Sequence, residues 1–135
     1  MYKKVYIAID DSEFSKQALS VATKIAKIFN ASLCLAHCIS EDDESKKDHG
    51  VQLLEKAKAS ITDLTIETQL ITADSTYGLN GITMAIASSA IDWEADLLVA
   101  GTSNKKGLDR FFLGSVAEEL VKKVDCSVML VRINQ

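Results

Sequence analysis

Apolar runs and amphipathic segments alternate along the chain. Mostly apolar runs predict strands that are covered on both faces, at residues 5–9, 32–39 and 97–100. Segments with apolar residues three and four positions apart predict helices, at residues 14–29, 51–60, 79–93 and 115–124. Strands and helices are therefore expected to follow one another along the whole chain.

Two further segments complete the predicted sheet. Residues 66–72 alternate apolar and polar side chains over part of their length, which is typical of an edge strand with one exposed face. Residues 127–131 form another apolar run. The alternation of strands and helices predicts a single-domain α/β fold, in which helices cover both faces of a doubly wound parallel sheet through right-handed crossovers.

The ends of the predicted elements carry cap and turn signals. Asn30 and Ala31 close the first helix, and the charged residues 40–50 predict a mobile, solvated surface connection. Asp10 and Glu13 have the D-x-x-E spacing of a helix N-cap. Asp10 either caps the first helix or contacts a ligand, and the two roles are compatible.

Composition excludes several classes of function. The chain has 135 residues, of which 47% are hydrophobic and 25% charged, as in a single water-soluble globular domain. A net charge of −4 argues against a non-specific nucleic-acid binder. No apolar run approaches the roughly 20 residues that span a bilayer. Because the N-terminus lacks a signal-peptide pattern, we expect a cytoplasmic protein without a membrane partner.

The three cysteines are expected to be buried free thiols. Cys34 and Cys38 share one face of a predicted strand, but their spacing puts them about 13 Å apart, which is too far for a disulfide. Cys126 leaves an odd number. His37 falls on the face opposite to Cys38, and His49 falls in the charged connection, so no cluster of metal ligands is expected.

A glycine-punctuated basic loop follows the predicted strand at residues 97–100. The loop runs from Gly101 to Ser115, and Ser115 with Glu118 fits a capping box at the start of a helix. Its positive side chains are Lys105, Lys106 and Arg110. Backbone N–H groups at a helix N-terminus, beside positive charge, predict phosphate binding. The alternative is a tight turn with ordinary surface lysines, which is common in α/β proteins.

Gly101, Asn104, Gly114 and Ser115 have the spacing of a known nucleotide motif. They resemble the G-x2-G-x9-G-[ST] motif of the universal stress protein family, with Asn104 where the family has glycine. The resemblance extends over essentially the whole chain, so we expect one such domain at residues 1–135. It implies a five-stranded sheet in the order 3-2-1-4-5, a fold like that of the adenine nucleotide alpha hydrolases. In that order the chain reverses direction between the first and fourth strands, where such sheets bind ligands.

The same resemblance implies a site for the nucleoside. In nucleotide-binding members of the family, the aspartate that matches Asp10 lies against the nucleoside, and a serine follows it at the position of Ser12. The residue that matches Cys38 offers backbone atoms to adenine, which a change of side chain would not remove. The implied ligand is ATP or a related adenine nucleotide. Mg²⁺ could accompany it, held by the phosphates together with an aspartate of the first loop.

The implied phosphate side lies in the second loop. Gly101, Gly114 and Ser115 are expected to approach the phosphates, together with the flanking residues Ala100 and Val116. Asn104 also belongs to this set. Asparagine tolerates a left-handed backbone, so a conformational role at position 104 would survive, but a role in clearance would not.

The sequence gives little support for catalysis. It contains no P-loop, no nucleophile elbow and no Cys–His pair, so slow ATP hydrolysis is the most that we expect. The first hypothesis is a nucleotide-binding module whose ligand state tunes contacts with a partner protein in a stress response. The alternative is a family member that binds no nucleotide and acts through dimerisation and protein contacts.

Two further hypotheses concern other features of the chain. Asp10 and Asp11 resemble the acidic pair of a phospho-acceptor receiver domain, whose acceptor would have to be Asp74. A receiver also needs a lysine after its fifth strand, where this chain has Arg132. Residues 128–131 would form a sheet edge, which needs protection. Pairing with a second copy would protect it, as in dimers of the universal stress protein family, whereas cover by the chain's own loops is the alternative.

Overall fold

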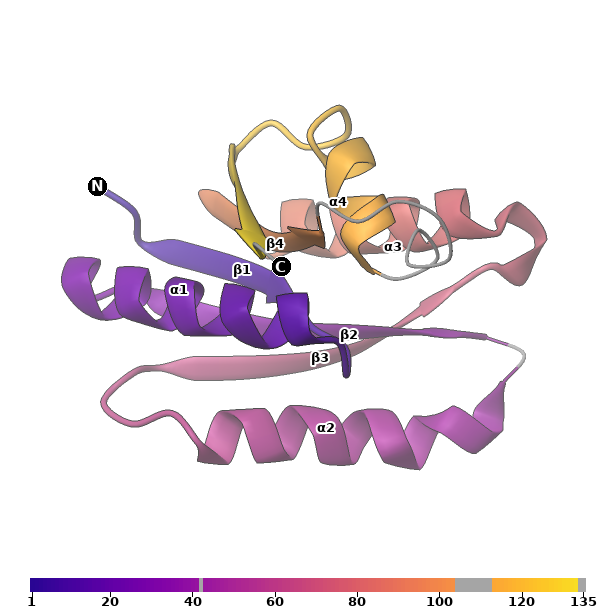
Figure 1. The fold of residues 1–135 in the computed structure, drawn as a ribbon, viewed down its shortest axis with the longest axis horizontal. Coiled ribbons are helices and arrows are strands. Elements are labelled where there is room, and N and C mark those ends of the chain that lie inside the picture. The colour runs from indigo at the N-terminus through magenta and orange to yellow at the C-terminus, as the bar shows by residue number, and fades with distance from the viewer. Residues whose placement is uncertain (42, 104–112, 134–135) are drawn as a thin grey trace.

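The computed structural model describes residues 1–41, 43–103 and 113–133. These residues form a five-stranded parallel sheet in the expected order β3-β2-β1-β4-β5 (Figure 1). The strands are β1 (Lys4–Ala8), β2 (Ser32–Ser40), β3 (Ile66–Ala73), β4 (Leu97–Ser103) and β5 (Ser127–Ile133). The helices are α1 (Glu13–Phe29), α2 (Lys47–Ala59), α3 (Leu79–Asp92) and α4 (Leu113–Leu120), with short 3-10 turns η1 (Glu44–Lys46) and η2 (Ser75–Tyr77).

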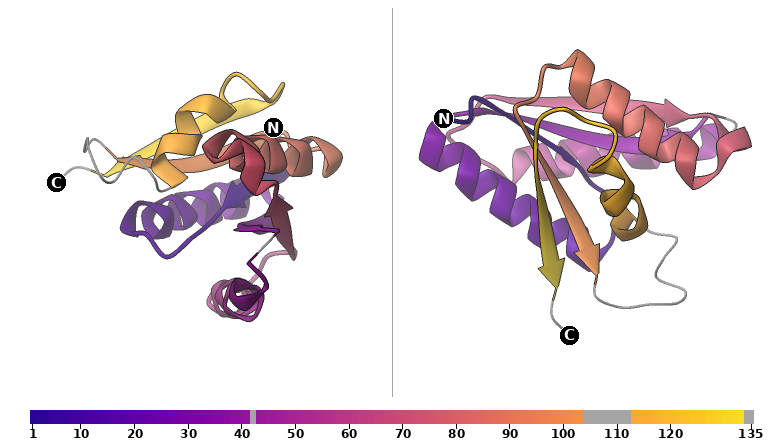
Figure 2. Two further views of the ribbon diagram at one scale, coloured as in Figure 1. Left: turned by 90° about the vertical axis from the view of Figure 1, so that its right-hand side faces the viewer. Right: turned by 90° about the horizontal axis from the view of Figure 1, so that it is seen from above.

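The sheet lies between two layers of helices, α1 and α2 on one face and α3 and α4 on the other (Figures 1 and 2). The central strand β1 shows why, since successive side chains of a strand point to opposite faces. Val5 and Ile7 pack among residues of α1 and α2, whereas Tyr6 and Ala8 pack among residues of α3 and α4. All four are at most 4% exposed, so β1 is buried on both faces as its apolar run predicts.

The two outer strands are β3 and β5. Glu67 and Thr72 of β3 are exposed while the residues between them are half-buried, which confirms the predicted edge strand. In β5, the side chain of Met129 is 37% exposed, and Val128 and Leu130 pack against the core on the α3 and α4 side. Strand β5 therefore forms an edge of the sheet, as the sequence predicts.

The connection after β2 is shorter than predicted. Instead of a loop over residues 40–50, the chain forms η1 and then enters α2 at Lys47. Most of the charged residues described in this stretch are exposed, and Lys46 lies 3.8 Å from the half-buried Asp43. Helix α2 thus begins one turn before its first apolar position, with a first turn that has no apolar side chain.

Helix α4 is displaced from its predicted position. It begins at Leu113, so Ser115 lies within its first turn and the predicted capping box, with Ser115 as N-cap, is wrong. It ends at Leu120, and Val121, which was expected inside the helix, lies beyond the end and is 50% exposed. Val116, Ala117 and Leu120 are buried against the sheet, which confirms the predicted apolar face over the first two turns.

The end of α1 agrees with prediction. Asn30 adopts a left-handed conformation with φ of 53°, and the amide of Ala31 donates to the carbonyl of Ala26 at 2.8 Å. Asparagine tolerates this region because its short polar side chain can hydrogen-bond locally.

The three cysteines are free thiols, of which Cys34 is buried and the other two are half-buried. Across the described ranges, none of the helices is both long enough and apolar enough to cross a membrane.

Candidate functional site

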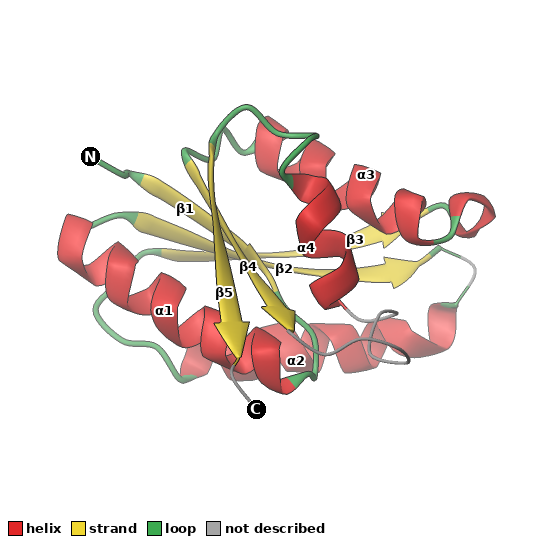
Figure 3. Cartoon of the chain, turned by 45° about the horizontal axis from the view of Figure 1, so that its top comes forward, coloured by secondary structure: helices red, strands yellow, loops and turns green. Residues whose placement is uncertain are grey.

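Strands β1 and β4 separate near their carboxyl ends. They pair only from Val5 with Leu97 to Ile7 with Val99, after which β4 continues beside β5 as far as Ser103. Beyond β1, the amide of Ile9 donates instead to the carbonyl of Ala36 in β2, at 2.7 Å. Because the helices that follow β1 and β4 pack on opposite faces, this is the switch point of the sheet (Figure 3).

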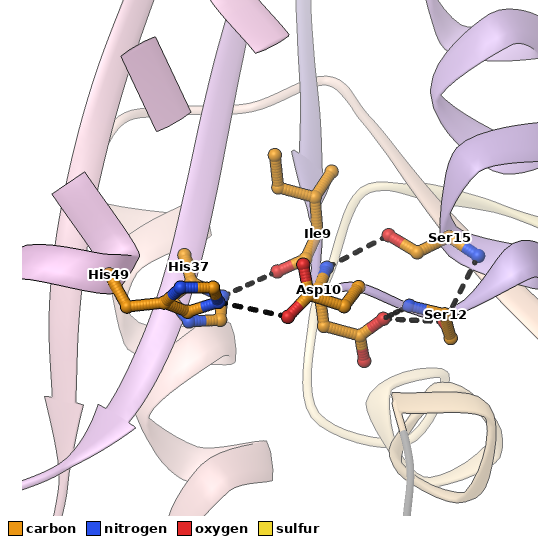
Figure 4. Close-up of polar contacts among 7 residues, drawn as sticks. Ile9, Asp10, Ser12, Ser15, His37 and His49 are labelled. Carbon is orange, nitrogen blue, oxygen red and sulfur yellow. Dashed lines mark hydrogen bonds and ion pairs between the residues drawn. The ribbon is translucent and has the colours of Figure 1, made fainter. Parts of the chain in front are cut away.

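A hydrogen-bonded turn joins β1 to α1. The carboxylate Oδ1 of Asp10 accepts the amide of Ser12 at 2.8 Å and also the Ser12 hydroxyl. Ser12 is the N-cap of α1, since its Oγ accepts the amide of Ser15, and the Ser15 hydroxyl in turn accepts the amide of Asp10 at 2.9 Å. The prediction that Asp10 caps α1 is therefore wrong: Asp10 orients the capping residue (Figure 4).

Among the described residues, the second carboxylate oxygen of Asp10 has no hydrogen-bond donor. Both hydrogen bonds of this half-buried side chain use Oδ1, and the residues that the structure describes supply no donor to Oδ2. A carboxylate oxygen can accept two hydrogen bonds. Asp10 therefore places an acceptor with spare capacity at the switch point, which suits a ligand that carries hydroxyl groups.

Gly101 lies within β4 and not in the loop where the sequence placed it. A Cβ at this position would lie 2.4 Å from the carbonyl oxygen of Phe14 and 2.8 Å from its carbonyl carbon. The first turn of α1 therefore packs directly on the backbone of β4. This contact explains why residue 101 is a glycine, whether or not a phosphate binds nearby.

The main chain of Cys38 faces the side of β2 from which β1 has departed. In a parallel strand, both backbone groups of one residue point to the same neighbouring strand, and those of the next residue point to the other. The carbonyl of Ala36 accepts the amide of Ile9, so the N–H and C=O of Cys38, two residues further on, face the same side. Within the described ranges they have no backbone partner.

The side chain of Cys38 points into the core on the α3 and α4 side. It packs at the margin of the cluster that contains Tyr6 and Ala36. Burial raises the pKa of this thiol to about 11. At neutral pH the sulfur is therefore a protonated apolar group, and any ligand at this position would meet the main chain of Cys38.

The structure describes some, but not all, of the other predicted site residues. Ala100 is buried in β4 and Val116 is buried in α4, each about 1% exposed. Gly114 and Ser115 lie in the first turn of α4, whereas Asn104 and the basic side chains Lys105, Lys106 and Arg110 lie outside the described residues. The structure thus brings Asp10, Ser12 and Cys38 together beside the end of β4.

Two histidines, which were considered from the sequence only as metal ligands, contact the β1–α1 turn. The Nδ1 of His37 lies 2.7 Å from the carbonyl oxygen of Ile9, and the Nε2 of His49 lies 2.9 Å from Oδ2 of Asp11 (Figure 4). His37 does lie on the face opposite to Cys38, as the period of a strand predicts. Its partner is a backbone carbonyl, for which a sequence carries no signal.

Neither a metal centre nor a second site emerges from the described residues. In the ranges that the structure covers, no three His, Cys, Asp or Glu side chains are placed to hold a metal ion. A hollow of about 180 Å³ lies between the end of α3 and the start of β5, lined by Ala90, Ile91, Ala95, Val124, Asp125 and Cys126. It lies at the amino ends of β4 and β5, away from the switch point.

Sequence comparison identifies relatives over nearly the full chain. A model described as the universal stress protein family matches residues 1–132. A universal stress protein of Methanocaldococcus jannaschii is 31% identical, with 98% of this chain and 83% of the relative covered. A putative universal stress protein of Staphylococcus aureus is 30% identical, with 99% of this chain and 86% of the relative covered.

Solved structures share the fold. A universal stress protein in complex with cAMP has a TM-score of 0.73 at 24% identity, with 98% of both chains covered. A universal stress protein from Archaeoglobus fulgidus in complex with dAMP has a TM-score of 0.65 at 18% identity, with 96% of this chain and 97% of that one covered. With a family model and close relatives that both span the fold described above, this chain belongs to the universal stress protein family.

Proposed function

We propose that this protein binds an adenine nucleotide at the carboxyl ends of β1 and β4. The observation that carries the proposal is the set of polar groups that the described fold leaves without partners there. They are the N–H and C=O of Cys38 and the Oδ2 of Asp10. Buried or half-buried polar groups are normally hydrogen-bonded, so an unpartnered set at a switch point favours a ligand.

The chemistry of these groups fits adenosine. The edge of adenine presents the N6 amino group as a donor and a ring nitrogen as an acceptor, which one residue can match with its C=O and N–H. The carboxylate of Asp10 can accept hydroxyl groups of ribose. Guanine presents a carbonyl oxygen where adenine has its amino group, so the C=O of Cys38 would disfavour it.

The relatives support the same ligand class. One solved universal stress protein holds cAMP and another holds dAMP. The phosphates would lie toward the first turn of α4, where Gly114 and Ser115 begin a helix whose unpaired N–H groups attract anions. ATP is the form that we propose, and Mg²⁺ would be held by its phosphates together with Asp10 or Asp11.

We further propose that two copies associate through β5 and that nucleotide state tunes contacts with a partner protein in a stress response. The outer edge of β5 and the exposed Met129 support this pairing, because an unpaired edge strand favours association. Free thiols agree with a reducing compartment such as the cytoplasm.

Thermal unfolding with added ATP and Mg²⁺ tests the proposal. A ligand present at about 100 times its Kd stabilises the native state by about 2.7 kcal/mol, which raises the Tm of a domain of this size by roughly 10 °C. GTP at the same concentration should raise it less. If ATP, AMP and cAMP all leave the Tm unchanged, the proposal is wrong and the alternative without nucleotide replaces it.

A matched pair of variants locates the site. Asp10→Asn keeps an acceptor for the amide of Ser12 but replaces the other oxygen by a donor, so it should weaken ATP binding about tenfold. Asp74→Asn is the control, because Asp74 accepts the amide of Thr76 at 2.9 Å in a similar turn after the outer strand β3. Equal affinities for the two variants would exclude Asp10 from the site.

A further inference from the structure

We propose that His37 ends the pairing of β1 with β2 and thereby keeps the main chain of Cys38 available to the adenine base. This inference rests on the proposed function. It makes His37 a positioning residue for the nucleotide site, acting through the carbonyl of Ile9. The group that bonds to this carbonyl decides whether the amide of Cys38 is free for a ligand.

The ladder between β1 and β2 has one missing hydrogen bond. Ala8 pairs with Ala36, and the amide of Ile9 donates to the carbonyl of Ala36. The next hydrogen bond of a parallel ladder would run from the amide of Cys38 to the carbonyl of Ile9. Within the described residues that bond is not made, and the Ile9 carbonyl instead lies 2.7 Å from Nδ1 of His37.

The chemistry of this contact determines which nitrogen of the His37 ring carries a proton. A carbonyl oxygen only accepts, so Nδ1 must carry the proton and donate it. The imidazole of His37 therefore substitutes for the amide of Cys38. That amide, together with the carbonyl of the same residue, is left facing the space beyond the end of β1.

Helix α2 holds the ring in this position. Gly50 lies over the imidazole, because a Cβ at residue 50 would be 3.0 Å from Cδ2 of His37 and 2.8 Å from Cδ1 of Leu70. The close approach of the helix limits rotation of the side chain. Among the described contacts, the ring is the group that bonds to the Ile9 carbonyl in place of the amide of Cys38.

The same hydrogen bond also bears on Asp10. The carbonyl of Ile9 belongs to the peptide group that ends in the amide of Asp10, and this amide is held from the other side by the Ser15 hydroxyl at 2.9 Å. The peptide plane between Ile9 and Asp10 is thus fixed at both its C=O and its N–H. His37 therefore positions the acceptor of Asp10 and the backbone edge of Cys38 relative to each other.

Amide hydrogen exchange of the nucleotide-free protein tests this arrangement. In His37→Ala, the amide of Cys38 should bond to the released Ile9 carbonyl, so its exchange should become about tenfold slower. A merely structural role would give the opposite sign, because loss of packing speeds exchange. His37→Asn places a side-chain N–H near the position of Nδ1 and should restore the native rate. His49→Ala, which removes an exposed contact to Asp11, is the control and should match the native protein.

Nucleotide titration supplies the second readout. His37→Ala should weaken ATP binding about fivefold, since one backbone hydrogen bond to the base would be lost, and should reduce the preference for ATP over GTP. His37→Asn should recover both. If His37→Ala does not fold, His37→Leu tests the same bond, because leucine has a side chain of similar size with no N–H to donate.

The outcomes separate the two proposals. Faster or unchanged exchange at Cys38 in the alanine or leucine variant would overturn the role of His37, whatever the nucleotide data show. Slower exchange of the Cys38 amide with unchanged ATP affinity would overturn the proposal that His37 keeps this main chain available to adenine. A native protein that binds no adenine nucleotide would refute the proposed function itself, while the exchange rates would still decide whether His37 ends the strand pairing.

Discussion

Gly101→Ala perturbs the contact on which the geometry of the switch point depends. The new Cβ would lie 2.4 Å from the carbonyl oxygen of Phe14, whereas ordinary contacts of this kind begin at about 3.4 Å. A backbone oxygen cannot rotate away as the end of a side chain can. The first turn of α1 must therefore move by about 1 Å relative to β4, or both must shift in part.

The magnitude follows from the cost of overpacking. Forcing a methyl group into a well-packed core costs about 1–3 kcal/mol, and we expect the upper end because the atom in contact belongs to a helix backbone. With an unfolding entropy of about 2.1 cal/mol/K per residue, a loss of about 3 kcal/mol lowers the Tm by roughly 10 °C. Urea unfolding should show a lower midpoint with an unchanged m-value.

Gly78→Ala provides the control. Gly78 has φ of 57° and ψ of −132°, and a Cβ there would meet nothing within 4 Å, so its cost of about 1–3 kcal/mol comes only from the backbone conformation. Gly101→Ala differs because its cost comes from the contact with α1. A midpoint for Gly101→Ala that equals that of the native protein would refute the packing of α1 on β4.

Two other features give measurable effects. Asn30→Ala should lower the free energy of unfolding by about 1 kcal/mol in a thermal melt, because residue 30 has φ of 53°, whereas Asn30→Gly should not; equal losses would contradict the left-handed cap. Burial raises the pKa of the Cys34 thiol from its ordinary 9.0 to about 12 and that of Cys38 to about 11. Unfolded thiols lose their protons near pH 9 while the native ones keep them, so the free energy of unfolding should fall as the pH rises from 9 toward 11. Urea midpoints that stay constant between pH 8 and pH 10.5 would contradict this.

Much of the fold followed from hydrophobic pattern, because the central strands are buried on both faces and their apolar runs have few alternative explanations. The pattern was less informative at the ends of helices. The first turn of α2, from Lys47 to Gly50, has no apolar side chain, so its start at Lys47 left no apolar signal. Asp10 and Ser12 are both good N-cap residues, and only the structure shows that Ser12 caps α1 while Asp10 holds Ser12.

The site was predictable in outline only. The order of strands came with the family resemblance, and it placed Asp10, Cys38 and Gly101 near one another. The sequence assigned Gly101 to a phosphate loop, but its contact with Phe14 depends on how a helix crosses a distant strand. His37 was missed for the same reason, since its partner is the main chain of Ile9, 28 residues away.

An NMR titration of the labelled protein with ATP and Mg²⁺ tests the central claim most directly. The account predicts shifts of the amide signals of Ser12, Cys38 and Gly101, at the carboxyl ends of the strands. Signals at the opposite end of the sheet, such as those of Asp96 and Cys126, should stay in place. A spectrum that ATP leaves unchanged, or one in which only the opposite end responds, would contradict it.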